Sequence, residues 1–396
     1  MLTSIVALRS TVANSARRWL CCGVMQMLLL VLAVAQGVTD ESILIGMEGP
    51  AQSFSVDEEN LGMRLVIELV NASGGVHGRH LVEKSYPRSQ ENVIDDMKAN
   101  VRRLVEEDRV FLLFNFGGPG SVPVGEYAIE RGVPYLFPHT ALLTVDGERH
   151  VFTSYPRYEG ESRVMLRYLT ETRGARRIAV IHADNIYGQY FVDRARELAD
   201  ELGYRFAGHE PLPRNPDSAR QQMEALRELE PDVVIMALYP AGARRVVEAK
   251  ASMGWDDVRL VSSGPLTDEQ YLNVEGGHAE GTLGFCHYPD PNESDASGIA
   301  EYRRLMAKYF PGHELNRYSL YGYVFGKLVV EGLERAGEDL TRERFLDAME
   351  SIHEWDSGGI LPAVSFSATD HHAQNAGFIC ELENGRFKAL TDWIQP

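Results

Sequence analysis

Strand and helix signals alternate along almost the whole chain, and this alternation limits the fold more than any other feature. Short apolar runs, such as residues 43–47 and 111–114, are typical of strands covered on both faces. Between them lie stretches with apolar residues at helical spacing, such as residues 60–72 and 92–107. Because parallel strands need crossovers that are usually helices, this order predicts an α/β fold with parallel sheets and helices on both faces.

The alternation runs through two rounds and then stops, which predicts two lobes. The first round ends near residue 156, and the second begins near Tyr158. The last part of the chain shows three helical stretches and one hairpin that turns at Asn384-Gly385, which are too few elements for a third lobe. A chain of 396 residues with 44% hydrophobic side chains can bury two ordinary cores. We therefore expect the last part to add to both lobes.

Residues 1–35 are expected to be a signal peptide. Arg9, Arg17 and Arg18 precede an apolar run from about residue 20 to residue 34, and Ala33-Val34-Ala35 fits a small-residue cleavage site. The apolar run is short for a membrane span, which needs about 20 residues. The pattern therefore predicts export followed by release, with a retained N-terminal anchor as the alternative.

The charge balance argues against nucleic acid and anionic membranes as partners. The chain has 57 Asp and Glu against 39 Lys and Arg, which gives a net charge of −18. Proteins that bind phosphate backbones need an excess of Lys and Arg at the binding surface. Removal of the signal peptide would also remove three arginines and make the chain still more acidic.

A glycine loop follows the apolar run at residues 111–114 and opens a helical stretch at Ser121. Gly117, Gly118 and Gly120 allow the backbone to turn sharply and to approach a ligand closely. At the start of a helix, free N–H groups and a hydroxyl form a seat for an anion. No Gly-Lys-Ser or Gly-Lys-Thr follows these glycines, which disfavours a nucleoside triphosphate. A small polar or carboxylate ligand is expected instead, without a cofactor.

Aromatic and polar side chains follow the ends of several predicted strands. Because the carboxyl ends of parallel strands meet at one edge of a sheet, these side chains are expected to face one cleft. Rings with polar tips suit a cleft that must remove water from a ligand and still form hydrogen bonds with it. The candidate ligand-binding residues at these ends are Phe54, Ser121, His139, Thr140, Tyr187, Tyr239 and Ser263.

The sequence carries no recognisable set of catalytic residues, so an enzyme is not expected. It contains no Gly-x-Ser-x-Gly, Cys-x-x-Cys or His-Glu-x-x-His motif. His371-His372 could chelate a metal, but without a nearby carboxylate pattern a polar loop is the better interpretation. Cys286 and His287 are neighbours on a predicted strand, so their side chains would point in opposite directions and could not act as a pair.

Cys286 and Cys380 are the two cysteines that remain after the predicted cleavage. In an oxidising compartment they could form a disulfide. They could equally be two small buried apolar side chains, because a long sequence separation says nothing about their distance in space. Both alternatives stay open at this point.

Several motifs, taken together and in order, resemble the leucine/isoleucine/valine-binding type of periplasmic solute-binding proteins that serve ABC importers. They include an Asn-Ala-Ser-Gly-Gly stretch at residues 71–75, an Asp-x-x-Tyr-Gly turn at residues 184–188 and a predicted helix that begins Tyr-Ser-Leu-Tyr-Gly-Tyr at Tyr318. The resemblance covers nearly all of the chain after residue 40. It runs through residues 43–50, 71–79, 110–121, 177–188, 318–337 and 357–366.

The resemblance implies two Rossmann-like lobes joined by three crossings, with the ligand held between them. By position, Ser121 matches the hydroxyl that receives the ligand carboxylate, and the loop His139-Thr140-Ala141 completes that seat. Phe54 matches a ring that covers the ligand. Tyr187 and Tyr239 match the tyrosines of the second lobe that close onto the ligand. Tyr158 completes the candidate set. The lobes are expected at residues 40–156 with 291–364, and at residues 157–290 with 365–396.

The resemblance also implies a periplasmic location and an ABC permease in the inner membrane as partner. The ligand would be a branched-chain amino acid or a related organic acid or amide. A ligand-sensing receptor on the same fold is the alternative function. One departure bears on the ligand: family members that bind α-amino acids usually have a carboxylate after Gly264-Pro265, where this chain has Leu266. Glu48 or Glu159 could replace that carboxylate, or the ligand could lack an amine.

Overall fold

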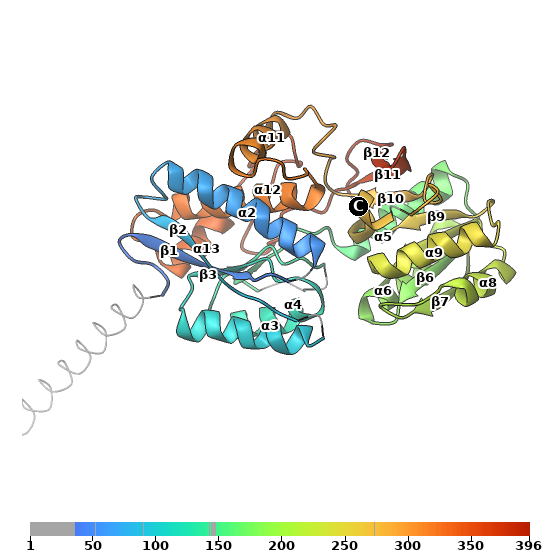
Figure 1. Ribbon diagram of the computed structural model, residues 1–396, viewed down its shortest axis with the longest axis horizontal. Helices are drawn as coiled ribbons and strands as arrows, with labels where there is room; N and C mark the ends of the chain where they lie inside the picture. The colour runs from blue at the N-terminus through green and yellow to red at the C-terminus, as the bar shows by residue number, and fades with distance from the viewer. Residues whose placement is uncertain (1–35, 52, 90, 142, 144–147, 273) are drawn as a thin grey trace, which may run out of the picture.

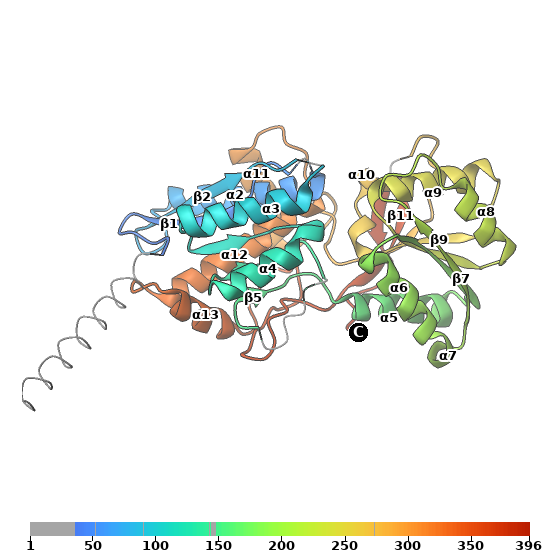
Figure 2. The same ribbon diagram turned by 90° about the horizontal axis from the view of Figure 1, so that it is seen from below.

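The chain forms two lobes that lie side by side, each built around its own sheet (Figure 1, Figure 2). The computed structural model describes residues 36–396, apart from residues 52, 90, 142, 144–147 and 273. The expected signal peptide lies outside the described residues. Both lobes are α/β and their sheets are largely parallel, so the predicted fold class is confirmed.

The first lobe contains a five-stranded parallel sheet with the order β2-β1-β3-β4-β5. Strands β1 and β2 pair over their whole length, whereas β3 and β4 pair through two residue pairs. The strands are β1 (Ser42–Glu48), β2 (His80–Tyr86), β3 (Leu112–Phe114), β4 (Tyr135–Leu136) and β5 (Val151–Phe152). The sequence predicted β4 over residues 133–137. The strand is shorter because Pro134 and Pro138 flank it, and proline has no N–H to donate to a ladder.

Helices of the first lobe cover both faces of this sheet (Figure 1). They are α2 (Phe54–Ala72), α3 (Val93–Arg102), α4 (Ser121–Glu130), α11 (Ser297–Tyr309), α12 (Arg317–Ala336) and α13 (Arg342–Glu350). Helix α2 begins six residues before the predicted start at Asn60. The residues before Asn60 are mostly polar and do not show helical spacing. The Asp57 carboxylate nevertheless fixes this turn, because it accepts hydrogen bonds from the backbone N–H groups of Ala51 and Ser53, at 2.7 and 3.1 Å.

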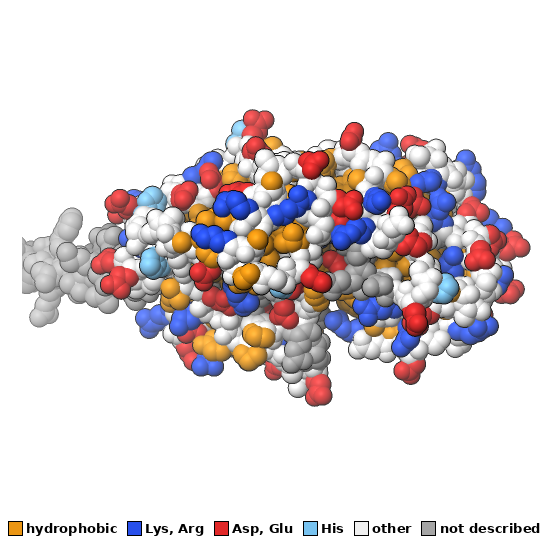
Figure 3. Space-filling view, turned by 45° about the horizontal axis from the view of Figure 1, so that its top comes forward, with side chains coloured by type: hydrophobic (Ala, Val, Ile, Leu, Met, Phe, Trp, Pro, Cys, Tyr) orange, Lys and Arg blue, Asp and Glu red, His pale blue; other side chains and the backbone are white. Residues whose placement is uncertain are grey.

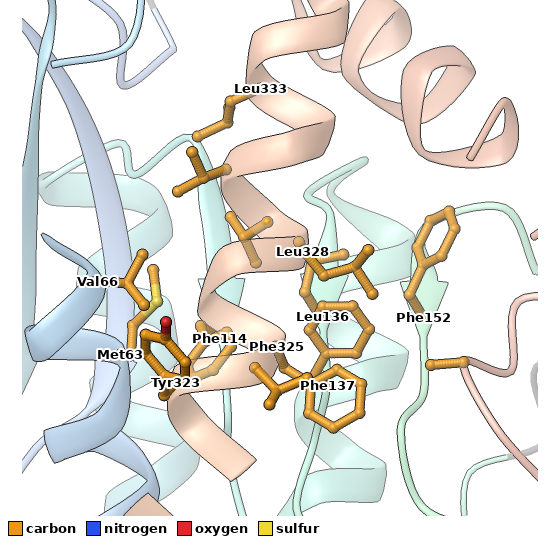
Figure 4. Close-up of a cluster of buried hydrophobic side chains, with 14 of the residues drawn as sticks. Met63, Val66, Phe114, Leu136, Phe137, Phe152, Tyr323, Phe325, Leu328 and Leu333 are labelled. Atoms are coloured by element: carbon orange, nitrogen blue, oxygen red, sulfur yellow. The ribbon is translucent and has the colours of Figure 1, made fainter. Parts of the chain in front are cut away.

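Helices α2 and α12 pack closely against each other at two glycines. A Cβ on Gly322 would lie 1.8 Å from the carbonyl oxygen of Glu59, and one on Gly62 would lie 2.1 Å from that of Ser319. Glycine therefore allows the two backbones to approach more closely than any other residue would. Figure 4 shows this core: side chains of α12 lie between α2 and the strands. The labelled residues are Met63, Val66, Phe114, Leu136, Phe137, Phe152, Tyr323, Phe325, Leu328 and Leu333.

The second lobe contains a seven-stranded sheet with the order β12-β11-β10-β9-β8-β6-β7. The pairs among β6 to β10 are parallel, and the C-terminal hairpin adds two antiparallel strands. The strands are β6 (Arg177–Ala183), β7 (Arg205–Leu212), β8 (Val233–Ala237), β9 (Arg259–Ser262), β10 (Leu283–Cys286), β11 (Phe378–Glu383) and β12 (Arg386–Ala389). Cys286 and Cys380 are joined by a disulfide, with Cα atoms 5.9 Å apart, which links β10 to β11.

Six helices accompany the second sheet. They are α5 (Tyr158–Arg167), α6 (Ile186–Glu197), α7 (Ala199–Leu202), α8 (Arg220–Glu228), α9 (Pro240–Ser252) and α10 (Glu269–Leu272). Asn185 caps α6, because its side chain accepts a hydrogen bond from the N–H of Gly188 at 3.2 Å. In the described part of the chain, no helix is both long and apolar enough to cross a membrane.

The chain passes between the two sheets three times. These passages lie between β5 and α5, between β10 and α11, and between α13 and β11. The sequence placed the third passage at residues 364 and 365. Phe366, however, packs edge to face against Phe152 of the first lobe, with ring centroids 5.0 Å apart, and Thr153 pairs with His372. The segment up to about Ala373 therefore lies against the first lobe.

Charged side chains of both signs are interspersed on the surface. Figure 3 shows Lys and Arg lying among Asp and Glu on both lobes, over the face that it draws.

Candidate functional site

A cavity of about 440 Å³ lies where the two lobes face each other, and side chains from both lobes line it. The first lobe contributes Ser53, Ser55, Val56, Arg88, Val93, Gly117, Gly118, Val122, His139, Thr140, Tyr155 and Tyr318. The second lobe contributes Tyr158, Asn185, Ile186, Tyr187, Arg214, Leu238, Tyr239, Pro240, Pro265 and Tyr271. Many of these residues follow the carboxyl ends of strands, which is where open α/β sheets bind ligands. We refer to this space as the cleft.

Five of the nine candidate residues line the cleft. They are His139, Thr140, Tyr158, Tyr187 and Tyr239. The other four, Phe54, Ser121, Ala141 and Ser263, do not line it.

The glycine loop is bonded to a carboxylate side chain of the protein itself. The N–H of Gly117 donates a hydrogen bond to Oε2 of Glu48, at 2.8 Å. The Ser121 hydroxyl is fully buried and donates to the carbonyl oxygen of Gly118. The loop therefore uses its first N–H and its serine hydroxyl within the fold, although the sequence pattern assigned both to a ligand.

Glu48 is 2% exposed and is held between that loop and a cation. Nε of Arg88 donates a hydrogen bond to Oε1 of Glu48, and the two form an ion pair. Burial raises the pKa of the Glu48 carboxyl, while the positive charge of Arg88 and the Gly117 N–H act in the opposite direction. Arg88 itself lines the cleft, so the pair connects the glycine loop to the ligand space.

Phe54, Ser263 and Ala141 support residues of the cleft from behind. The Phe54 ring packs edge to face against Tyr271 and Tyr318, with centroids 6.2 and 6.0 Å away. The hydroxyl oxygens of Ser263 and Tyr187 lie 2.7 Å apart, at hydrogen-bonding distance. These contacts position aromatic rings that line the cleft.

The Ala141 backbone is a hydrogen-bond partner of the Tyr158 hydroxyl. Burial raises the pKa of Tyr158 far above its ordinary value, so this phenol stays neutral.

A buried carboxylate orients His139 at the floor of the cleft. Nδ1 of His139 lies 2.5 Å from Oε1 of Glu59 and 2.9 Å from the hydroxyl oxygen of Tyr155. Burial raises the pKa of the Glu59 carboxyl, and the charge of His139 opposes this shift. The Nδ1 side of the ring is thus fixed by the fold, and the histidine is held in one orientation.

The phenol of Tyr239 lies between two polar neighbours of the second lobe. Nδ2 of Asn185 donates a hydrogen bond to the Tyr239 hydroxyl at 3.1 Å. The guanidinium carbon of Arg214 lies 4.3 Å from the centroid of the Tyr239 ring, within the range of a cation–π contact. Asn185, Tyr239 and Arg214 therefore form one polar wall of the cleft.

Sequence reasoning missed several polar or aromatic residues that line the cleft. Arg88 and Arg214 follow β2 and β7, so the strand-end rule that found the tyrosines could also have found them. Asn185 lies in the turn after β6, next to the chosen Tyr187. Tyr155, Tyr271 and Tyr318 lie on a passage between the lobes or on helices, and no strand-end signal marks them.

The position after Gly264-Pro265 carries no charge. Leu266 is fully buried and does not line the cleft. Neither Glu48 nor Glu159 lines it: Glu48 is paired with Arg88, and Glu159 is exposed. Oε1 of Glu161 accepts a hydrogen bond from the N–H of Gly264 at 2.7 Å, and burial raises the pKa of this carboxyl to about 8.

Among the described residues, no group of three or more His, Cys, Asp or Glu is arranged to hold a metal ion. His371 and His372 take up other contacts. Nδ1 of His371 lies 3.2 Å from the carbonyl oxygens of Glu148 and Val151, and the His372 ring contacts Arg157 and Asp370.

The sequence matches the family model described as "Periplasmic binding protein" over residues 43–386. It is similar to a Leu/Ile/Val-binding protein homolog of Brucella melitensis, with 24% identity over 298 residues, which cover 74% of this chain and 78% of the relative.

Many solved structures share the fold, and two of them bear on the ligand. A branched chain amino acid ABC transporter protein from Thermus thermophilus, solved with bound valine, gives a TM-score of 0.79 at 15% identity, covering 91% of this chain and 98% of its own. A fatty acid ABC transporter substrate-binding protein from Thermomonospora curvata gives 0.78 at 19% identity, covering 91% and 94%. With the family model matching most of its length, the chain belongs to the type I periplasmic binding proteins, which bind solutes and are not enzymes.

Proposed function

We propose that this protein is the extracytoplasmic solute-binding component of an ABC importer. It captures a small carboxylate-bearing ligand in the cleft, closes on it by a hinge motion and presents it to a permease in the inner membrane. The observation that carries this proposal is the cleft itself, whose walls come from both lobes and whose lining combines aromatic rings with hydrogen-bonding groups.

The names of similar proteins support a carboxylate as the shared part of the ligand. One structural neighbour was solved with valine, and another is a fatty acid transporter protein. Valine and a fatty acid differ in size and in the presence of an amine, but both carry a carboxylate and an apolar chain. The cleft has room for either, because its volume lies in the range of small-molecule sites, about 300–1,000 Å³.

In this proposal the nine candidate residues take two roles. Tyr158, Tyr187, Tyr239, His139 and Thr140 contact the ligand. The remaining candidates, Phe54, Ser121, Ala141 and Ser263, hold those residues and their loops in place.

The test is calorimetric titration of the chain from residue 36 onward with L-leucine, L-valine and amine-free carboxylic acids. Replacement of Tyr239 by alanine should weaken binding about 10-fold or more, because the ring and its hydroxyl line the cleft. The matched control is Tyr168→Ala, since Tyr168 is also a partly buried tyrosine of the second lobe beneath an arginine, Arg173, but lies outside the cleft. Equal affinities for the wild type and Tyr239→Ala would refute the proposed site.

A further inference from the structure

We infer that the ligand of the cleft is a carboxylate without an amine, and that Arg88 is the residue of the first lobe that receives its negative charge. This inference rests on the proposed function and names the chemical class of the ligand. It follows from three observations: the position of Arg88, its pairing with Glu48, and the absence of a carboxylate from the described lining of the cleft.

Arg88 is a buried cation with more N–H donors than its ion pair with Glu48 uses. Its side chain is 6% exposed, and it follows directly after β2 and Pro87. Among the described residues, its side chain makes one hydrogen bond, from Nε to Oε1 of Glu48. A guanidinium has five N–H donors, so the four on the two Nη atoms remain for a group inside the cleft that Arg88 lines.

Glu48 fixes Arg88 without filling the ligand space. It accepts from Arg88 through Oε1 and from the Gly117 N–H through Oε2, and it does not line the cleft. A planar guanidinium held at Nε keeps its Nη edge in a set direction, and this edge can bind a carboxylate through two parallel hydrogen bonds. The pair thus replaces the anion seat that the glycine loop would otherwise form for the ligand.

The described lining of the cleft offers no counter-charge for an ammonium group. It contains Arg88, Arg214 and His139 but no Asp or Glu. Glu59 is fully buried and does not line the cleft, and its Oε1 lies 2.5 Å from Nδ1 of His139. An ammonium in this cleft would be removed from water beside two guanidinium groups, which is costly without a paired carboxylate.

The first experiment compares ligands that differ only in the amine. L-Leucine is titrated against 4-methylpentanoate, and L-phenylalanine against 3-phenylpropanoate, at pH 7 with the chain from residue 36 onward. We expect the amine-free member of at least one pair to bind about 10-fold or more tightly than its amino acid, because the amine would be a buried charge without a partner. If acids bind but neither amine-free acid binds about 10-fold more tightly than its amino acid, the inference is overturned and the proposed function stands. If no acid of either kind binds, both fall.

The second experiment tests Arg88 itself. Arg88→Gln alone would leave Glu48 buried and unpaired, so the double variant E48Q/R88Q is used to remove both charges together. The matched control is R64Q/E83Q, which removes another ion pair of the first lobe, with Nε of Arg64 2.7 Å from Oε2 of Glu83, outside the cleft.

The readout is the preference for 3-phenylpropanoate over its uncharged amide, 3-phenylpropanamide. In E48Q/R88Q this preference should fall about 10- to 100-fold, mainly through weaker binding of the acid. In R64Q/E83Q it should stay as in the wild type. An unchanged preference in E48Q/R88Q, with thermal unfolding showing a folded protein, would exclude Arg88 as the carboxylate receptor. A variant that does not fold is replaced by Arg88→Lys, for which the preference should also fall, because lysine cannot bind a carboxylate through a planar fork.

Discussion

Glu161 is a buried carboxyl group whose protonation should affect stability near neutral pH. It is 2% exposed, and burial raises its pKa from 4.5 to about 8, with the Gly264 N–H acting in the opposite direction. Between these two values, the unfolded chain releases a proton that the folded chain retains. This contribution to the free energy of unfolding is therefore fully present below about pH 4.5 and is lost as the pH rises through 8.

Replacement of Glu161 by glutamine should remove this loss, because the amide oxygen still accepts from Gly264 and never ionises. We expect the E161Q variant to gain stability over the wild type as the pH rises from 5 to 8, measured by urea unfolding at each pH. Nearby His287 stays neutral in this range, since burial lowers its pKa to about 3. Glu159→Gln, an exposed position on the same helix, is the control. Parallel pH curves for E161Q and the wild type would contradict the prediction.

Single residues of the cleft were predictable only where a local pattern marks them. Tyr187 and Tyr239 follow strands, and their positions alone indicate a role at the sheet edge. Ser121 had the right local pattern, but a partner from another element, the Glu48 side chain, occupies the loop before it. The sequence around Ser121 carries no sign of that long-range contact. Tyr318 lines the cleft from the start of a long helix, where the sequence pattern alone predicts an ordinary core residue.

At the scale of elements, the packing of α2 against α12 controls the position of Glu59 and, through it, of His139. Gly322 approaches the backbone of Glu59 so closely that a Cβ would lie 1.8 Å from the Glu59 carbonyl oxygen. The atoms that the added methyl group would meet belong to the backbone of Glu59, so no side-chain rotation can relieve the clash. The helices would have to separate.

Gly322→Ala should therefore destabilise the protein by about 1–3 kcal/mol, in the range of overpacked core positions. Urea unfolding measures the loss. Gly337→Ala is not a suitable control because Gly337 has a positive φ of 81°, so Glu334→Ala, at an exposed position of the same helix, is used. A variant as stable as the wild type would show that the two helices do not pack at this distance.

Elements with strong periodicity were predictable, and their ends were less so. Strand β2 was predicted to the residue, because a glycine-containing turn precedes it and Pro87 follows it. The start of α2 was missed because hydrogen bonds from backbone N–H groups to the Asp57 carboxylate, not apolar spacing, fix it. The two residues of β5 were not predicted at all, since so short a run gives no period to detect.

For the whole molecule, two rounds of alternating elements were enough to predict two lobes, because each round can close a sheet of its own. What the alternation could not predict is where the last segment packs. Phe366 lies with the first lobe through aromatic contacts with Phe152 and Phe137, and such contacts depend on the completed fold. The relative position of the lobes, which creates the cleft, depends on the same kind of long-range packing.

The proposed closure of the lobes makes a prediction about an exposed side chain at the rim of the cleft. Ile186 is 75% exposed although it is a large apolar residue, and it begins helix α6 of the second lobe. Val93 and Val122 line the same cleft from the first lobe. If the lobes approach each other around a ligand, Ile186 loses contact with water against this wall, and that burial adds to the affinity.

Ile186→Ser should therefore weaken binding of the tightest acid in the panel by about 1 kcal/mol, roughly fivefold, the free energy of partly burying such a side chain. The unfolding free energy of the ligand-free protein should change by no more than about 0.5 kcal/mol, because the side chain is already in water. Leu390→Ser, at a 37% exposed position away from the cleft, should leave the affinity unchanged. Small-angle X-ray scattering should show a smaller radius of gyration when the wild type binds the acid. Unchanged affinity in Ile186→Ser would mean that the rims do not meet on closure, since a serine there would then cost the complex nothing.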